Sequence, residues 1–304
     1  MLFFPYKADV QLNRLPVLTL IVCFVCIFVF ARQVISENAY DNAVQQYCTQ
    51  LTSDERSLMR YLVVPTGDSY CDVLIRVRKA TDPMEEIKEL AKNSKPANFY
   101  KTREGDVNYI IDTLTSSSQR FKASVPRNLT DKLQFDPNHT TLLTSVTSAF
   151  SHGDTSHLVF NLLFFFAFAA SVEVITGYVY YLVFFLLSTF GSKFAYAYSV
   201  HDLEVALPSI GLSGVVMAMM SFLATVKPDL YIRCFFWFFV FVRRFSVPAL
   251  ALAAFYIGKN IYDYASDDAD IHINYVAHLS GAAIGVVMGL VYRLSNSDHL
   301  NRLG

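Results

Sequence analysis

The sequence predicts an all-α polytopic membrane protein with six transmembrane helices and a large extramembrane insert between the first two. Of its 304 residues, 53% are hydrophobic and only 17% are charged, whereas soluble domains average about 45–50% and about 25%. Six apolar runs come close to the roughly 20 residues that a helix needs to cross a bilayer. More than half of the charged residues fall within residues 37–150, so a polar segment interrupts the membrane part.

The six apolar runs are expected at residues 15–31, 157–175, 178–198, 211–226, 247–262 and 272–294. Several are short, which suits helices buried in a tilted bundle. The alternative for the first run is the apolar part of a signal peptide, although no A-x-A cleavage site follows it. Residues 227–245 combine a Phe/Trp cluster with three arginines. We expect this segment to lie in the headgroup interface, and a seventh span is the alternative.

This pattern divides the chain into four parts: residues 1–36 with the first helix, an outer insert at 37–150, a membrane core at 151–294 and a tail at 295–304. Within the insert, Asp82-Pro83 predicts the start of an amphipathic helix. Residues 73–77 and 109–114 are expected to be strands. Cys48 and Cys71 either form a disulfide or remain two free thiols.

Lysine and arginine in the short loops predict the orientation. With the N-terminus inside, the outer short loops contain only Lys193 and Lys259, and the inner side contains Lys7, Arg14, Lys227, Arg233, Arg243, Arg244, Arg293 and Arg302. We therefore expect a multi-pass protein with a cytoplasmic N-terminus, in the cell (inner) membrane if the host is bacterial. The acidic loop with Asp263, Asp267, Asp268 and Asp270 then lies outside, like the insert.

A net charge of -1 without a basic block excludes a nucleic-acid partner recognised by electrostatics.

Four polar residues within the apolar runs are candidate functional residues, because such side chains are costly in a membrane. His157 and Asn161 are four residues apart on the second run and share one face. Ser213 begins the fourth run and His278 lies near the start of the sixth. All three runs enter from the outer side, so the four side chains share one layer within about 10 Å of that surface. Each residue alone is more simply explained by packing or an interhelical hydrogen bond; their joint occurrence favours a site.

Helix packing predicts that two of these residues meet. Small residues form stripes on the fourth and sixth runs, at Gly211, Gly214 and Ala218 and at Gly281, Gly285 and Gly289. Such stripes let membrane helices approach closely, which would bring Ser213 Oγ to a His278 nitrogen, as a base-activated serine requires. Backbone N–H groups at the start of the fourth run, with His157 and Asn161, could stabilise an oxyanion. No Asp or Glu lies in this layer, so we expect a dyad without an acidic third member.

Three motifs occur in order along the chain: His152-x-x-x-x-His157-x-x-x-Asn161, Gly211-x-Ser213-Gly214 and Ala277-His278-x-x-Gly281-x-x-x-Gly285. Together they resemble the rhomboid intramembrane serine proteases over roughly residues 145–294. The resemblance implies a six-helix core that cleaves transmembrane protein substrates in the bilayer near their outer end. It also implies Ser213 as nucleophile, His278 as general base and an oxyanion and substrate-binding site at His157, Asn161 and Gly211. His152 and Glu173 are expected to be structural. The sequence departs from the family at Ser280, in the length of the insert and in lacking a Trp-Arg pair in the first outer loop.

Other protease classes do not fit the sequence. A metalloprotease would need H-E-x-x-H, which does not occur. An aspartyl protease would pair a Tyr-Asp such as Tyr262-Asp263 with a Gly-x-Gly-Asp, which is also missing. No cofactor and no metal are expected. The remaining alternative is a catalytically inactive rhomboid-like protein that binds membrane clients, although such relatives generally lack the serine or the histidine that this chain has.

Overall fold

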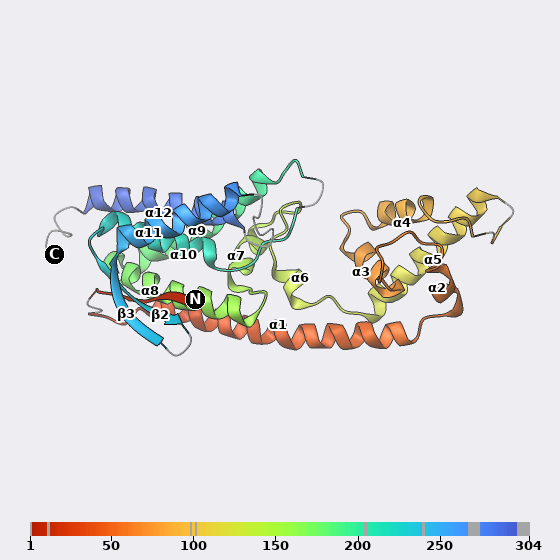
Figure 1. The fold of residues 1–304 in the computed structure, drawn as a ribbon, viewed down its shortest axis with the longest axis horizontal. Coiled ribbons are helices and arrows are strands. Elements are labelled where there is room, and N and C mark those ends of the chain that lie inside the picture. The colour runs from red at the N-terminus through yellow and green to blue at the C-terminus, as the bar shows by residue number, and fades with distance from the viewer. Residues whose placement is uncertain are drawn as a thin grey trace. The chain divides into compact units, whose positions relative to one another are not determined.

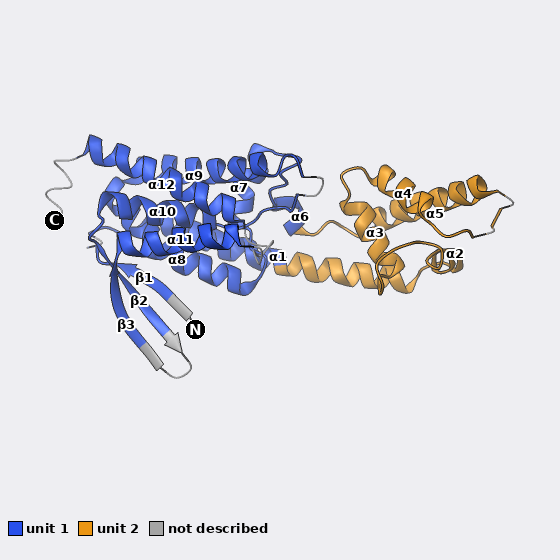
Figure 2. Ribbon diagram, turned by 45° about the horizontal axis from the view of Figure 1, so that its top comes forward, with its two compact units in different colours: residues 1–33, 130–304 blue, residues 34–129 orange. Residues whose placement is uncertain are grey.

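The computed structural model describes residues 2–10, 13–97, 99–100, 102–203, 206–238, 241–266 and 274–296. The predicted acidic residues Asp267, Asp268 and Asp270, and Arg302 of the tail, lie outside these ranges. The chain forms two compact units, residues 1–33 with 130–304 (unit 1) and residues 34–129 (unit 2), coloured blue and orange in Figure 2. Residues 130–150, which the sequence assigned to the insert, cluster with unit 1.

Unit 1 is mostly helical (Figure 1). Among the described residues, four helices are long and apolar enough to cross a membrane: α1 (Val17–Thr49), α8 (Thr155–Thr176), α9 (Tyr178–Ser199) and α12 (Tyr275–Ser295). The chain is therefore an integral membrane protein with a mostly helical fold. The other elements of unit 1 are α6 (Leu129–Leu133), α7 (Leu142–Phe150), α10 (Ser213–Val226), α11 (Ala249–Ala265), β1 (Leu2–Ala8), β2 (Tyr231–Phe238) and β3 (Phe241–Pro248).

Each predicted apolar run forms a helix, and local sequence explains where the helices begin. Asp154 caps α8 by accepting a hydrogen bond from the His157 N–H at 2.9 Å. This bond holds the pKa of the Asp154 carboxyl below its usual range. Gly177, with φ of 82°, separates α8 from α9. Asn274 caps α12 by accepting from the Ala277 N–H at 2.9 Å.

Helix α10 is the buried centre of unit 1 and packs most extensively against α12. A Cβ atom added to Gly281 would overlap the carbonyl oxygen of Gly214, and one added to Gly285 would overlap that of Ala218. The two backbones are thus in direct contact, which no larger residue would permit. The predicted contact between the two small-residue stripes is confirmed.

Glu173, near the end of α8, has a structural role. Its fully buried carboxylate accepts hydrogen bonds from the Leu18 N–H at 2.9 Å and from the N–H and hydroxyl of Thr19, both at 2.7 Å. These N–H groups belong to the first turn of α1, where a helix has no partners of its own. The carboxylate therefore caps α1 from another helix and is stabilised by its positive end.

For residues 227–245 the structure contradicts the alternative of a seventh helical span among the described residues. Residues 231–238 and 241–245 belong to β2 and β3, and the three strands pair antiparallel in the order β1-β2-β3. The place of this segment in the headgroup interface stays a prediction. Side chains on β2 alternate: Ile232 and Cys234 are fully buried, whereas Tyr231 and Arg233 are exposed. This period of two is the signature of a strand. β1 lies against α8, where the rings of Phe4 and Phe160 stack at 5.0 Å.

Unit 2 contains the second half of α1 together with α2 (Ser53–Leu58), α3 (Tyr70–Lys79), α4 (Pro83–Lys92) and α5 (Arg103–Ser124). The helix predicted after Asp82 is confirmed as α4. The two predicted strands are wrong, since both segments are helical, within α3 and α5. The buried residues recur at helical spacing in both: Val73, Leu74 and Val77 in α3, and Ile110, Leu114, Ser117 and Phe121 in α5.

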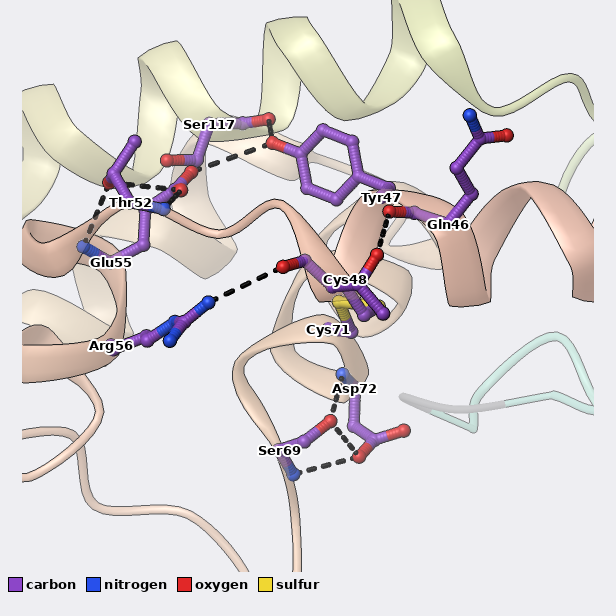
Figure 3. Close-up of a disulfide and its surroundings, with 11 residues drawn as sticks. Gln46, Tyr47, Cys48, Thr52, Glu55, Arg56, Ser69, Cys71, Asp72 and Ser117 are labelled. Carbon is purple, nitrogen blue, oxygen red and sulfur yellow. Dashed lines mark hydrogen bonds between the residues drawn. A yellow bond between two sulfur atoms is a disulfide. The ribbon is translucent and has the colours of Figure 1, made fainter.

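Cys48 and Cys71 form a disulfide that joins the end of α1 to the start of α3 (Figure 3). Hydrogen bonds surround this joint. Tyr47 donates to the Ser117 carbonyl at 3.2 Å, and Ser69 and Asp72 form a capping box at the start of α3. Of the two alternatives left open by the sequence, the disulfide is the one in the structure.

Replacing Cys48 and Cys71 with serine should destabilise unit 2 while the fold of unit 1 is unaffected. The bridge closes a loop with a sequence separation of 23, for which the chain-entropy estimate is about 3 kcal/mol of unfolding free energy. Hydrogen exchange of the full-length protein should show faster exchange in α3 and α5, and unchanged exchange in α10. Equal protection of α3 in both proteins would contradict this estimate.

Candidate active site

The backbone brings Ser213 and His278 together. Ser213 is the first residue of α10, directly after a turn in which Gly211 has φ of 104°. His278 is in the first turn of α12. Close packing of the two helices places His278 Nε2 at 2.8 Å from Ser213 Oγ, in hydrogen-bond geometry. The arrangement is that of a serine hydroxyl beside a base able to accept its proton.

A third residue in contact with this pair was not foreseen from the sequence. Asn260 of α11 has its Oδ1 at 2.8 Å from His278 Nδ1. No Asp or Glu occurs in this layer of the sequence, and an asparagine on the fifth apolar run belongs to no motif that would single it out. His278 thus contacts Ser213 through one ring nitrogen and Asn260 through the other.

His157, Asn161 and Gly211 lie side by side next to Ser213. The Asn161 Nδ2 donates to the His157 carbonyl, one turn earlier on α8, at 2.8 Å. This hydrogen bond fixes the orientation of the Asn161 amide. A Cβ atom on Gly211 would lie 2.7 Å from His157 Nε2. Gly211 therefore provides room for the imidazole as well as the positive φ of the turn. Its own N–H donates to the Ser148 carbonyl at 2.8 Å, so it is not a free donor for an oxyanion.

His152 is buried beside these residues. Its ring lies edge-on to that of His157, with 5.2 Å between centroids. Burial, and next the neighbouring His157, lower the pKa of His152 to about 4, so the ring is neutral at pH 7. Its main chain is held by Gln33 of α1, which accepts from the His152 N–H at 3.1 Å and donates to its carbonyl at 3.3 Å. The main chain of His152 makes these hydrogen bonds, whereas neither of its buried ring nitrogens has a hydrogen-bond partner among the described residues. The structural hydrogen bond expected of this side chain is therefore not present.

Lys193 lies in a helix and not in an outer loop, where the predicted orientation placed it. It lies within α9, is buried, and its Nζ donates to Ser209 Oγ at 3.0 Å. The same oxygen accepts from Asn274 Nδ2 at 3.0 Å. Lys193 therefore links α9 to the residues that precede α10 and α12, which carry the serine and the histidine.

A cavity of about 770 Å³ lies over the Ser213–His278 pair. Polar side chains from α8, α10, α11 and α12 and from the segments before these helices line it, together with aromatic and aliphatic side chains. The volume is in the usual range for ligand sites. The lining includes His157, Asn161, Ser213, Asn260 and His278, with Phe160, Phe164, Tyr196, Leu207, Ile210, Val216, Met217 and Tyr256.

Comparison with known proteins gives two findings. A family profile described as Rhomboid domain matches residues 139–295, more than half of the chain, and this range includes Ser213, Asn260 and His278. The chain is also 30% identical over 164 residues to RHOMBOID-like protein 12, mitochondrial, of Arabidopsis thaliana. That alignment covers 48% of this chain and 45% of the relative, so the chain spans about half the length of the curated relative it matches.

Proposed function

Because this chain belongs to the rhomboid family, we propose that it is an intramembrane serine endopeptidase that cleaves transmembrane segments of other membrane proteins near the outer face. The observation that carries the proposal is the 2.8 Å contact between Ser213 Oγ and His278 Nε2 in the wall of a cavity. A serine kept only for packing would need neither a base within hydrogen-bond reach nor a space beside it for a substrate.

In this proposal α1, α8, α9, α10, α11 and α12 are the six spans, with the N-terminus in the cytoplasm. Residues 151–294 are the catalytic core, between the first span with its outer insert and the tail at 295–304. Helices α8, α10 and α12 then all begin at the outer side. Their first turns carry His157, Ser213 and His278, so a substrate would be cut close to the outer surface.

The proposed reaction begins when Ser213 Oγ attacks the scissile carbonyl carbon while His278 Nε2 takes its proton. The negative charge that develops on the carbonyl oxygen is stabilised by unpaired N–H groups at the start of α10, aided by the helix dipole, and by His157 and Asn161. His278 returns the proton to the leaving amine, and the acyl-enzyme forms. Water, deprotonated by His278, then releases the acid and restores Ser213.

Incubation of the detergent-purified protein with a single-span model substrate tests this proposal. The expected result is two products whose junction, located by mass spectrometry, lies in the outer part of the span. The Ser213→Ala protein should give no products. Binding of the substrate without cleavage by the wild-type protein would instead support the inactive rhomboid-like alternative.

Replacing Asn161 with alanine should slow turnover without abolishing it. Loss of one oxyanion donor costs about 10²–10³ in rate, and the α10 N–H groups remain. His157→Ala should have an effect of the same order. Both are measured as kcat on the model substrate, with thermal stability as the control for folding. An Asn161→Ala protein as inactive as Ser213→Ala, but equally stable, would show that the assigned roles are wrong.

A further inference from the structure

Asn260 is placed so that only its oxygen faces His278. The Asn260 Nδ2 donates to the Tyr256 carbonyl one turn earlier on α11, at 2.8 Å. Because the nitrogen is held by its own helix, Oδ1 is the atom presented to His278 Nδ1, at 2.8 Å. The amide side chain is thus fixed at both ends, and it can only accept a hydrogen bond from the imidazole.

This contact determines which nitrogen of the neutral imidazole carries the proton. A neutral histidine has one N–H group and one lone pair. An acceptor at Nδ1 favours the form with the proton on Nδ1, which leaves the Nε2 lone pair facing Ser213 Oγ. With the proton on Nε2 instead, two lone pairs would face each other at Asn260, and His278 could not accept the proton of Ser213.

We propose that Asn260 is a positioning residue that holds His278 in the tautomer and orientation required of a general base; this inference rests on the proposed function. The same amide accepts from the imidazolium that forms when Ser213 gives up its proton. A histidine oriented by an asparagine is an established variant of triad chemistry on unrelated folds.

The rival explanation is that the contact only ties α11 to α12. Two substitutions separate the explanations. Asn260→Ala removes both the acceptor and the bond to Tyr256. Asn260→Asp also removes the bond to Tyr256 but keeps an oxygen acceptor for His278. A contact that only ties α11 to α12 predicts that kcat and thermal stability fall together in Asn260→Ala and recover together in Asn260→Asp. The positioning role predicts that kcat falls and recovers while thermal stability stays nearly equal.

The measurement is kcat and KM of the detergent-purified full-length protein on a single-span substrate. For Asn260→Ala we expect kcat to fall about tenfold to hundredfold, because part of the contribution of general-base catalysis is lost, with KM nearly unchanged. Asn260→Asp should recover at least half of that loss on a logarithmic scale. Ile261→Ala, at an exposed neighbouring position of α11, is the matched control and should retain wild-type kcat.

Thermal unfolding of each variant supplies the folding control. Similar stabilities of the alanine and aspartate variants with different kcat values would support the inference. Wild-type kcat in Asn260→Ala, equal losses in both variants, or a change confined to KM would overturn it while leaving the proposed function intact. Absence of Ser213-dependent cleavage by the wild-type protein would overturn the proposed function, and the inference with it.

Discussion

Replacing Ser213 with alanine is expected to abolish cleavage of a membrane substrate, and His278→Ala should do the same. The two side chains are 2.8 Å apart and act as a unit, so removing both should cost no more than removing either one. Product formation should fall by at least about 10⁴-fold, to the limit of detection. The measurement is product formation over time, by the wild-type, single-variant and double-variant proteins at equal concentration.

Ser221→Ala is the matched control for this result. Ser221 is a buried serine two turns further along α10 and lines no part of the cavity. Its loss should leave the cleavage rate near that of wild type. Residual cleavage by Ser213→Ala comparable to that of Ser221→Ala would exclude Ser213 as nucleophile.

Gly285→Leu is expected to unfold or inactivate the protein without changing any catalytic atom. Even a Cβ atom at position 285 would overlap the Ala218 carbonyl oxygen, so a leucine must push α10 and α12 apart. Such overpacking typically costs about 1–3 kcal/mol or more. A displacement near 1 Å between Ser213 and His278 can lower the rate about 10²-fold. Thermal stability and cleavage rate in one detergent measure both effects.

Gly258→Leu provides the comparison for that variant. Gly258 also lies in a helix of unit 1, α11, but nothing lies within 4 Å of where its Cβ would be. The leucine should therefore be tolerated there. If Gly285→Leu matched Gly258→Leu in both stability and rate, close packing of α10 against α12 would not be what brings Ser213 to His278.

The membrane helices and the Ser213–His278 contact could be predicted from the sequence, for physical reasons. Apolar runs near 20 residues have few alternatives to helices, and the glycine stripes allow close contact between α10 and α12. In unit 2 the β-branched residues of 73–77 suggested a strand, but Ser69 and Asp72 form a capping box that starts a helix. A capping box depends on a specific pair of side chains, whereas strand propensity depends strongly on tertiary context.

The strands β2 and β3 and the role of Asn260 could not be predicted in the same way. Aromatic residues next to arginines suit both a membrane interface and a strand, and the choice depends on pairing with β1, which is more than 200 residues away in sequence. Asn260 is 18 residues from His278 and belongs to another helix. Its contact depends on how α11 is rotated against α12, which the apolar pattern of α11 does not determine.

The most direct test of Ser213 as a base-activated nucleophile is to locate the residue to which an active-site phosphonylating reagent attaches. A fluorophosphonate reacts with a serine only when a neighbouring base activates the hydroxyl. Peptide mapping by mass spectrometry of the treated wild-type protein should find the phosphonyl group on Ser213, and His278→Ala should remain unlabelled under the same conditions. Labelling of another serine in the wild-type protein, or equal labelling of Ser213 in His278→Ala, would contradict a serine protease built on Ser213 and His278.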